Sequence, residues 1–175
     1  CLTGGNFKEI VMDEIKKIMV ALGFSEYAEG IFNYADMLAA KFGAELIVAN
    51  IVNSRDVEAV AVITNMGYDL DPERYIKEIK DERQNAFEEI AKNATLARDS
   101  IKLILEIGNP IDELLKIILD ENVDLVVMGV KGRTDLEHIL IGSVAEKLFR
   151  RAPVTVVSYR DEKSRQRLKN RINLT

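Results

Sequence analysis

Five short apolar runs, separated by segments with helical periodicity, limit most strongly what this chain can fold into. Most of the runs are continuous in Ile, Val, Leu and Met rather than alternating with polar residues, which is typical of parallel strands covered on both faces. Alternating strands and helices require right-handed crossovers and predict an α/β fold, an open doubly wound sheet of five parallel strands with helices on both faces. Lys102 and Glu106 place the third run nearer an edge. The runs are Ile18–Leu22, Leu46–Val52, Ile101–Leu105, Leu125–Met128 and Val154–Val157.

Capping residues and prolines predict four helices between the runs. Ser25 caps the first, which ends at Gly43; Asp71-Pro72-Glu73 opens the second; Asn109-Pro110 opens the third; and Ser143 with Glu146 forms a capping box for the fourth. In the third helix we expect Leu114, Leu115, Ile118 and Leu119 to face the core. The stretch Asn53–Leu70 is expected to be a long connection, because it is too long for a simple turn.

The length of 175 residues argues for one domain. We expect an N-terminal extension at residues 1–14, a globular domain at 15–158 and a basic tail at 159–175. From Arg160 to the end the charge is +4, which leaves −9 on the rest of a chain whose net charge is −5. Such a tail is either a solvated terminal helix or extension, or a segment that contacts a partner, nucleic acid or the acidic domain itself.

Composition excludes several classes of function. The net charge of −5 argues against nonspecific nucleic-acid binding by the whole protein. The chain has one cysteine, Cys1, and one histidine, His138, too few for a cysteine-cluster or histidine-based metal centre. The apolar runs are far shorter than the roughly 20 residues that cross a bilayer. We therefore expect a cytoplasmic protein without a membrane or nucleic-acid partner.

A glycine motif follows the fourth run. Gly129-Val130-Lys131-Gly132 is separated by nine residues from Gly142-Ser143-Val144, where the fourth helix begins. Free N–H groups at a helix start form an anion site, and glycines allow a ligand to approach the backbone closely. Taken singly, each residue has an ordinary interpretation as a strand end, a cap or a solvated charge. The fixed spacing favours a phosphate site, to which Lys131 and Arg133 would add positive charge.

This motif resembles the nucleotide-binding signature of the ATP-binding branch of the universal stress protein family. The resemblance covers roughly Ile15–Ser158 and includes Lys17–Val20 with Phe24-Ser25-Glu26, Gly108-Asn109-Pro110 and Ala152–Val157. It implies a strand order of 3-2-1-4-5 and an adenine nucleotide lying across the ends of strands one, two and four. The implied base contacts are Ala21, Leu22, Ile51, Met128 and Gly129; the implied phosphate contacts are Gly132, Gly142, Ser143 and Val144.

The chain departs from the family pattern on the base side of this site. Gly23 is also assigned to the binding site, where the first strand of the family usually ends in an Asp that hydrogen-bonds the nucleotide. Asn50 and Asn53 replace a frequent His and Asp. Losing one charge-assisted hydrogen bond costs roughly 1.5–3 kcal/mol, or about ten- to a hundredfold in affinity. Gly23 therefore raises the question of whether the nucleotide still binds, and which one.

Three functions are compatible with these features. The first is a dimeric stress-response or regulatory protein that binds ATP or AMP, with or without Mg²⁺. Asp135 and Glu137 are candidates to hold that ion through water, although exposed acidic residues usually only increase solubility. The second is a slow ATP hydrolase or phosphoryl-transfer enzyme, disfavoured because the chain has no P-loop and no obvious general base, so no catalytic residue is assigned. The third is a dimeric family member that has lost its nucleotide. A homodimer is expected through the uncharged edge strand Val154–Val157.

Overall fold

A computed structural model describes residues 14–66, 71–130 and 142–170, together with Ile172. Five strands form one sheet in the order β3-β2-β1-β4-β5, and every neighbouring pair is parallel. The α/β fold and the strand order are confirmed, and the third strand does lie at an edge. The strands are β1 (Lys17–Ala21), β2 (Glu45–Asn53), β3 (Ile101–Gly108), β4 (Leu125–Gly129) and β5 (Thr155–Tyr159).

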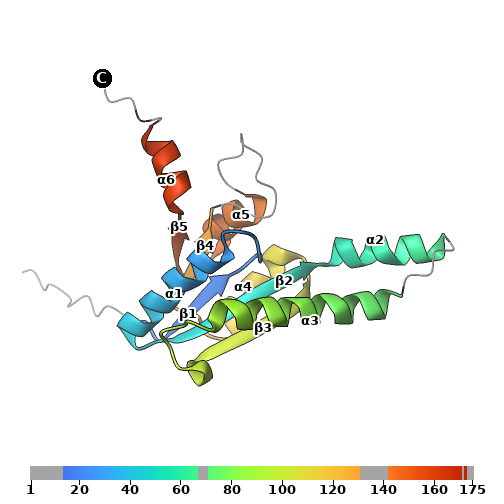
Figure 1. The fold of residues 1–175 in the computed structure, drawn as a ribbon, viewed down its shortest axis with the longest axis horizontal. Helices are drawn as coiled ribbons and strands as arrows, with labels where there is room; N and C mark the ends of the chain where they lie inside the picture. Colours follow the sequence, from blue (N-terminus) through green and yellow to red (C-terminus); the bar gives the residue numbers. More distant parts are fainter. Residues whose placement is uncertain (1–13, 67–70, 131–141, 171, 173–175) are drawn as a thin grey trace, which may run out of the picture.

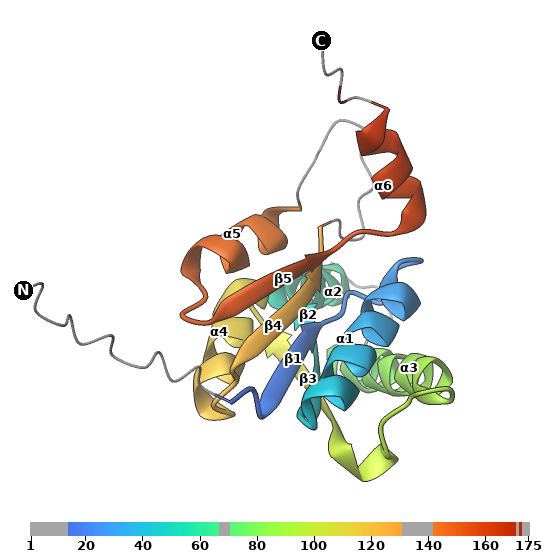
Figure 2. The ribbon, with the colours of Figure 1, turned by 90° about the vertical axis from the view of Figure 1, so that its left-hand side faces the viewer.

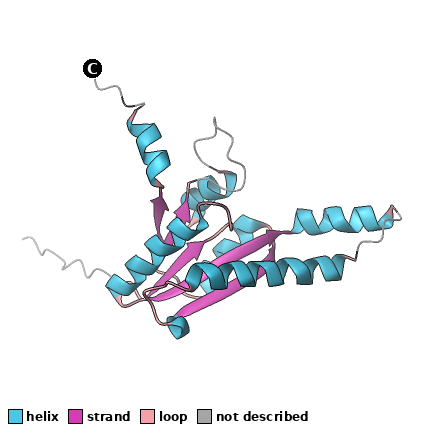
Figure 3. Cartoon of the chain, viewed as in Figure 1, coloured by secondary structure: helices cyan, strands magenta, loops and turns pink. Residues whose placement is uncertain are grey.

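Helices cover both faces of the sheet (Figure 2). One face packs against α1 (Ala28–Phe42) and α3 (Pro72–Ala91), and the other against α4 (Pro110–Asp120) and α5 (Ser143–Arg151). Figure 3 shows the strands enclosed between these helices. The central strands β1, β2 and β4 are largely apolar on both faces because each face is covered, as the continuous runs predict. Within the described ranges, no helix is both long and apolar enough to cross a bilayer.

The core beneath α1 is fixed by a buried aromatic pair and a buried carboxylate. Phe32 and Phe87 are fully buried, with ring centroids 6.3 Å apart and planes at 79°. Asp36 is 3% exposed, and its two oxygens accept hydrogen bonds from the backbone N–H groups of Thr95 (2.7 Å) and Leu96 (3.0 Å). The loop after α3 is therefore tied to α1 by a carboxylate whose charge is satisfied by backbone donors.

The predicted long connection at Asn53–Leu70 is wrong for most of its length, because α2 spans Ser54–Asn65. The side chain of Asn53 caps it, accepting from the N–H of Arg55 at 3.1 Å. None of its residues is buried, so the sequence carries no core-facing stripe that would have revealed the helix. It runs beside α3, and both project beyond the sheet (Figure 1).

Two predicted caps and one predicted core residue are also corrected. α1 begins at Ala28, and Ser25 instead accepts a 3.4 Å hydrogen bond from the N–H of Tyr27 in the preceding turn. α5 has Gly142 as its N-cap, so Ser143 is the first helical residue and the expected capping box does not form. In α4, Leu119 is 65% exposed, whereas Ile111 and Ile117 are buried. The C-terminal stop of α1 at Gly43 is confirmed by its φ of 65°.

Candidate functional site

A cavity of about 390 Å³ opens at the carboxyl ends of β1, β2 and β4. It lies between β1 and β4, where the order of the strands in the sheet reverses. The helix α1, which follows β1, covers one face of the sheet, and α4, which precedes β4, covers the other. In open α/β sheets this reversal point is where ligands bind. The start of α5 forms the opposite wall. The volume falls within the range of small-molecule sites, about 300–1,000 Å³.

The ends of β1 and β2 are locked together at this cavity. The N–H of Leu22 donates to the carbonyl of Ala49 at 2.9 Å, which continues the pairing of the two strands past Ala21. The Asn50 amide nitrogen donates to the Leu22 carbonyl at 2.6 Å. Asn50 is 3% exposed, and its amide oxygen has no donor among the described residues. An unpaired buried acceptor is costly, so this wall has unused capacity to accept a hydrogen bond.

The loop between β1 and α1 combines an open position with a strained one. A Cβ built on Gly23 would meet no heavy atom within 4 Å, and Gly23 is not among the residues with positive φ. Phe24 has a φ of 35°, in a region that a bulky side chain rarely adopts. Its ring packs on the core, and the Arg83 guanidinium carbon lies 5.5 Å from the ring centroid. This cation–π contact from α3 helps to hold the loop in place.

Backbone amides form the other end of the cavity. The N–H of Gly142 donates to the carbonyl of Val130 at 2.8 Å, which joins the start of α5 to the end of β4. Ser143, Val144 and Ala145 follow and line the cavity. N–H groups in the first turn of a helix have no intrahelical acceptor, and the helix dipole makes this end positive. The arrangement is suited to the negatively charged end of a ligand.

Nine of the twelve binding residues predicted from the sequence line this one cavity. They come from four separate segments: Ala21, Leu22 and Gly23; Ile51; Met128 and Gly129; and Gly142, Ser143 and Val144. Lys131, Gly132 and Arg133 lie outside the described residues, as do Asp135, Glu137 and His138. The described ranges contain no cluster of His, Cys, Asp or Glu that could hold a metal ion.

The structure adds lining residues that were not predicted. Asp56 reaches the cavity from the first turn of α2, and Pro110 reaches it from the start of α4; Asn53, which the family comparison had placed on the base side, lines it as well. Sequence reasoning missed Asp56 because the helix that carries it was taken for a connection. The Asn53 cap followed by Asp56 in the first turn was the available signal, since both favour a helix N-terminus.

Comparisons with known proteins agree with this architecture. The sequence profile of the Universal stress protein family matches residues 14–160. The chain is 30% identical over 152 residues to universal stress protein MJ0577 of Methanocaldococcus jannaschii, covering 81% of this chain and 94% of that protein. It is 32% identical over 148 residues to a putative universal stress protein of Staphylococcus aureus strain USA300, covering 84% and 85%.

Solved structures show the same fold. The structure of MJ0577 superposes with a TM-score of 0.65 at 28% identity, covering 85% of this chain and 99% of that one. Universal stress protein UspA from Lactobacillus plantarum gives a TM-score of 0.64 at 19% identity, covering 85% and 100%. A universal stress protein in complex with cAMP gives 0.55 at 19% identity, covering 83% and 97%. At the two lower identities, the likeness concerns the fold alone.

Proposed function

Because the chain belongs to the universal stress protein family, we propose that its cavity binds an adenine nucleotide, ATP or AMP. We further propose that the protein acts as a dimeric regulator in the stress response. The observation that carries the first proposal is the convergence of nine predicted binding residues, from four segments, on one cavity of about 390 Å³.

The chemistry of the cavity fits the two ends of a nucleotide. Leu22, Ile51 and Met128 offer apolar contacts for a base, and the amide oxygen of Asn50 in the same wall lacks a donor among the described residues. An exocyclic amino group on the base would supply such a donor. The first-turn amides of α5 would receive the phosphates. One universal stress protein of the same fold has been solved in complex with cAMP, an adenine nucleotide.

The test of nucleotide binding is isothermal titration calorimetry with ATP, ADP and AMP, with and without Mg²⁺. The Ser143→Asp variant places a carboxylate among the phosphate-binding amides, while an acidic residue at a helix N-terminus stabilises the helix. We expect it to lose nucleotide binding and to keep its thermal stability. Asn93→Asp adds the same charge on an exposed residue that does not line the cavity, and should bind normally. Absence of binding to the unmodified protein would refute the proposal.

The dimer is proposed to form through β5, which pairs with β4 on one side and has no strand on its other side among the described elements. An open edge strand with little charge invites pairing with a second copy. On the neighbouring helix α5, Phe149 is 66% exposed and would gain cover from a partner. Light scattering should give twice the chain mass of 19.7 kDa, and a monomeric mass at micromolar concentration would refute the dimer.

A further inference from the structure

A second, smaller pocket adjoins the cavity at the end of β4. It has a volume of about 30 Å³, room for about one water molecule, so it is too small to hold a ligand by itself. Ile31 and Gly129 line both spaces. Val130 lines the small pocket, and its carbonyl receives the N–H of Gly142 at the cavity's phosphate end. The small pocket and the cavity therefore adjoin along Ile31 and Gly129.

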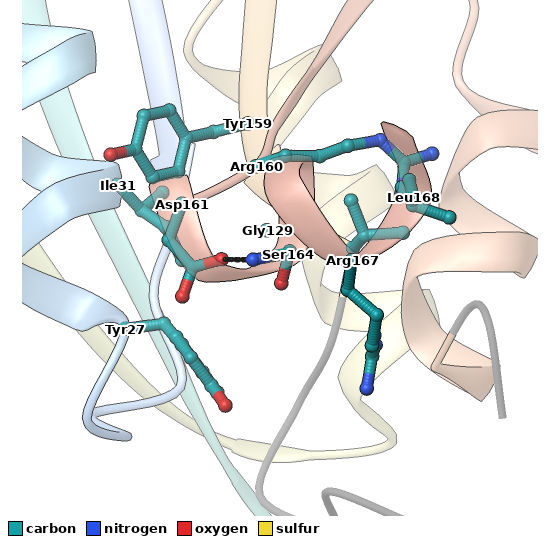
Figure 4. A pocket seen from close by; sticks show the side chains of 10 residues that line it. Tyr27, Ile31, Gly129, Tyr159, Arg160, Asp161, Ser164, Arg167 and Leu168 are labelled. Carbon is teal, nitrogen blue, oxygen red and sulfur yellow. Dashed lines mark hydrogen bonds between the residues drawn. The ribbon is translucent and has the colours of Figure 1, made fainter. Parts of the chain in front are cut away.

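The far side of this pocket is formed by α6 (Glu162–Lys169), a helix that lies beyond the family match ending at residue 160. It follows β5 directly from the carboxyl edge of the sheet (Figure 1). Asp161 caps it, accepting from the N–H of Ser164 at 2.7 Å (Figure 4). α6 therefore borders the small pocket, on the side away from the cavity.

The junction between β5 and α6 is held against the domain by aromatic packing. The Tyr159 ring lies 5.4 Å from that of Tyr34 on α1, measured between centroids. Gly30 leaves the space that this ring occupies, because a Cβ there would lie 3.0 Å from the Tyr159 hydroxyl oxygen. α6 is therefore anchored at its start rather than attached by a free linker.

The side chain of Arg167, on α6, carries a buried hydrogen-bond donor that is not used among the described residues. Its Nε is buried and has no hydrogen-bond partner within the described part of the chain. Arg165, by contrast, pairs with Glu162 at 2.7 Å. Figure 4 shows the side chains of Arg167 and Tyr27 on opposite sides of the small pocket, with their polar ends pointing the same way. A guanidinium with an unused Nε–H, lining a pocket that adjoins the cavity, is suited to bind phosphate oxygens.

We propose that Arg167 is a specificity residue that recognises the terminal phosphates of a nucleoside triphosphate bound in the cavity. This inference rests on the proposed function and adds a preference for ATP over AMP. The phosphates would lie along the amides of α5, and only the terminal groups of a triphosphate would reach Gly129, where the cavity adjoins the small pocket that Arg167 lines. AMP has a single phosphate, which would not reach Arg167. The residue would therefore distinguish ATP from AMP by the number of phosphate groups.

The experiment compares ATP and AMP affinities by calorimetry for the unmodified protein, Arg167→Gln, Arg167→Lys and the matched control Arg165→Gln. We expect Arg167→Gln to weaken ATP binding by about tenfold or more, the effect of one lost charge-assisted contact, and to leave AMP binding unchanged. Arg167→Lys should restore part of the ATP affinity because it keeps the charge without the planar fork. Arg165→Gln should bind both ligands normally, because Arg165 does not line either pocket.

The outcomes separate this inference from the proposed function. If Arg167→Gln binds ATP as tightly as the unmodified protein, or loses ATP and AMP affinity equally, the role of Arg167 is refuted while nucleotide binding stands. If the unmodified protein binds neither nucleotide, both proposals fail. Thermal unfolding of each variant without ligand identifies a loss of fold, and a variant that unfolds early and loses both affinities counts against the inference.

Discussion

Replacing Gly23 with aspartate is expected to strengthen nucleotide binding. In the family pattern an Asp that hydrogen-bonds the nucleotide stands at this position, and this chain carries Gly23 instead. A side chain fits there, since a Cβ would meet no heavy atom within 4 Å and the backbone is not among the positive-φ residues. Gly23 is exposed, so a carboxylate would lose little hydration before the ligand arrives.

The expected gain in nucleotide affinity can be estimated from the hydrogen bond that the new carboxylate would form. A hydrogen bond to a charged group contributes about 1.5–3 kcal/mol, which corresponds to about ten- to a hundredfold tighter binding. Removing a glycine at a compatible position stabilises the fold by about 0.4–1 kcal/mol, because the unfolded chain loses freedom. Gly23→Asp should therefore bind ATP and AMP more tightly without loss of stability. The gain should be similar for both nucleotides, because this position lies at the base side rather than the phosphate side.

Calorimetry with ATP and AMP measures the gain, and thermal unfolding measures stability. Gly23→Ala isolates the backbone effect and should leave affinity near that of the unmodified protein. Gly23→Asn keeps the shape of the aspartate without its charge and should give a smaller gain. If Gly23→Asp binds no more tightly than Gly23→Ala while its stability is unchanged, the assignment of this end of the cavity to the nucleoside is wrong.

Two stability predictions test the core beneath α1. Phe32→Ala removes a fully buried ring that packs edge-on against Phe87, and should lower the free energy of unfolding by about 3–5 kcal/mol in urea titrations. Phe42→Ala on the same helix, where the residue is 49% exposed, is the control and should cost much less; equal losses would contradict the assigned packing. Asp36→Ala leaves two backbone N–H groups without their carboxylate and should cost about 3 kcal/mol; a loss below about 1 kcal/mol would show that water replaces it.

Apolar runs and capping residues in the sequence predicted the strands that are buried on both faces and the helices that begin with a local cap. The β-runs were visible because both faces of the sheet are covered, and the helix starts at Asp71-Pro72 and Asn109-Pro110 were visible because capping involves neighbouring residues. The helix α2 was missed because it buries nothing. Ser143 was taken for a cap because the true cap, Gly142, is fixed by its hydrogen bond to the distant Val130.

Some residues of the candidate site could likewise be predicted from the sequence, and others could not. The spacing of the glycine motif pointed to a phosphate-binding helix start, and the resemblance to a known family supplied the strand order and the base-side residues. Local patterns could not show that Asp56 and Pro110 would reach the same cavity, since their meeting depends on how α2 and α4 leave the sheet.

The alternation of strands and helices was determined by the amino-acid sequence alone, because it arises from contacts over a few residues. The glycine spacing could be read directly from the same sequence. The tertiary structure decided which strand ends and helix ends lie next to one another. The Asp124 carboxylate, for example, accepts from the N–H groups of Lys16 and Lys17 across more than 100 residues, at 2.8 and 2.9 Å. The same long-range packing leaves the Asn50 oxygen without a donor among the described residues and places the buried Arg167 Nε at the small pocket that adjoins the cavity. Burial and unmet hydrogen bonds of this kind depend on the whole fold, which no local pattern encodes.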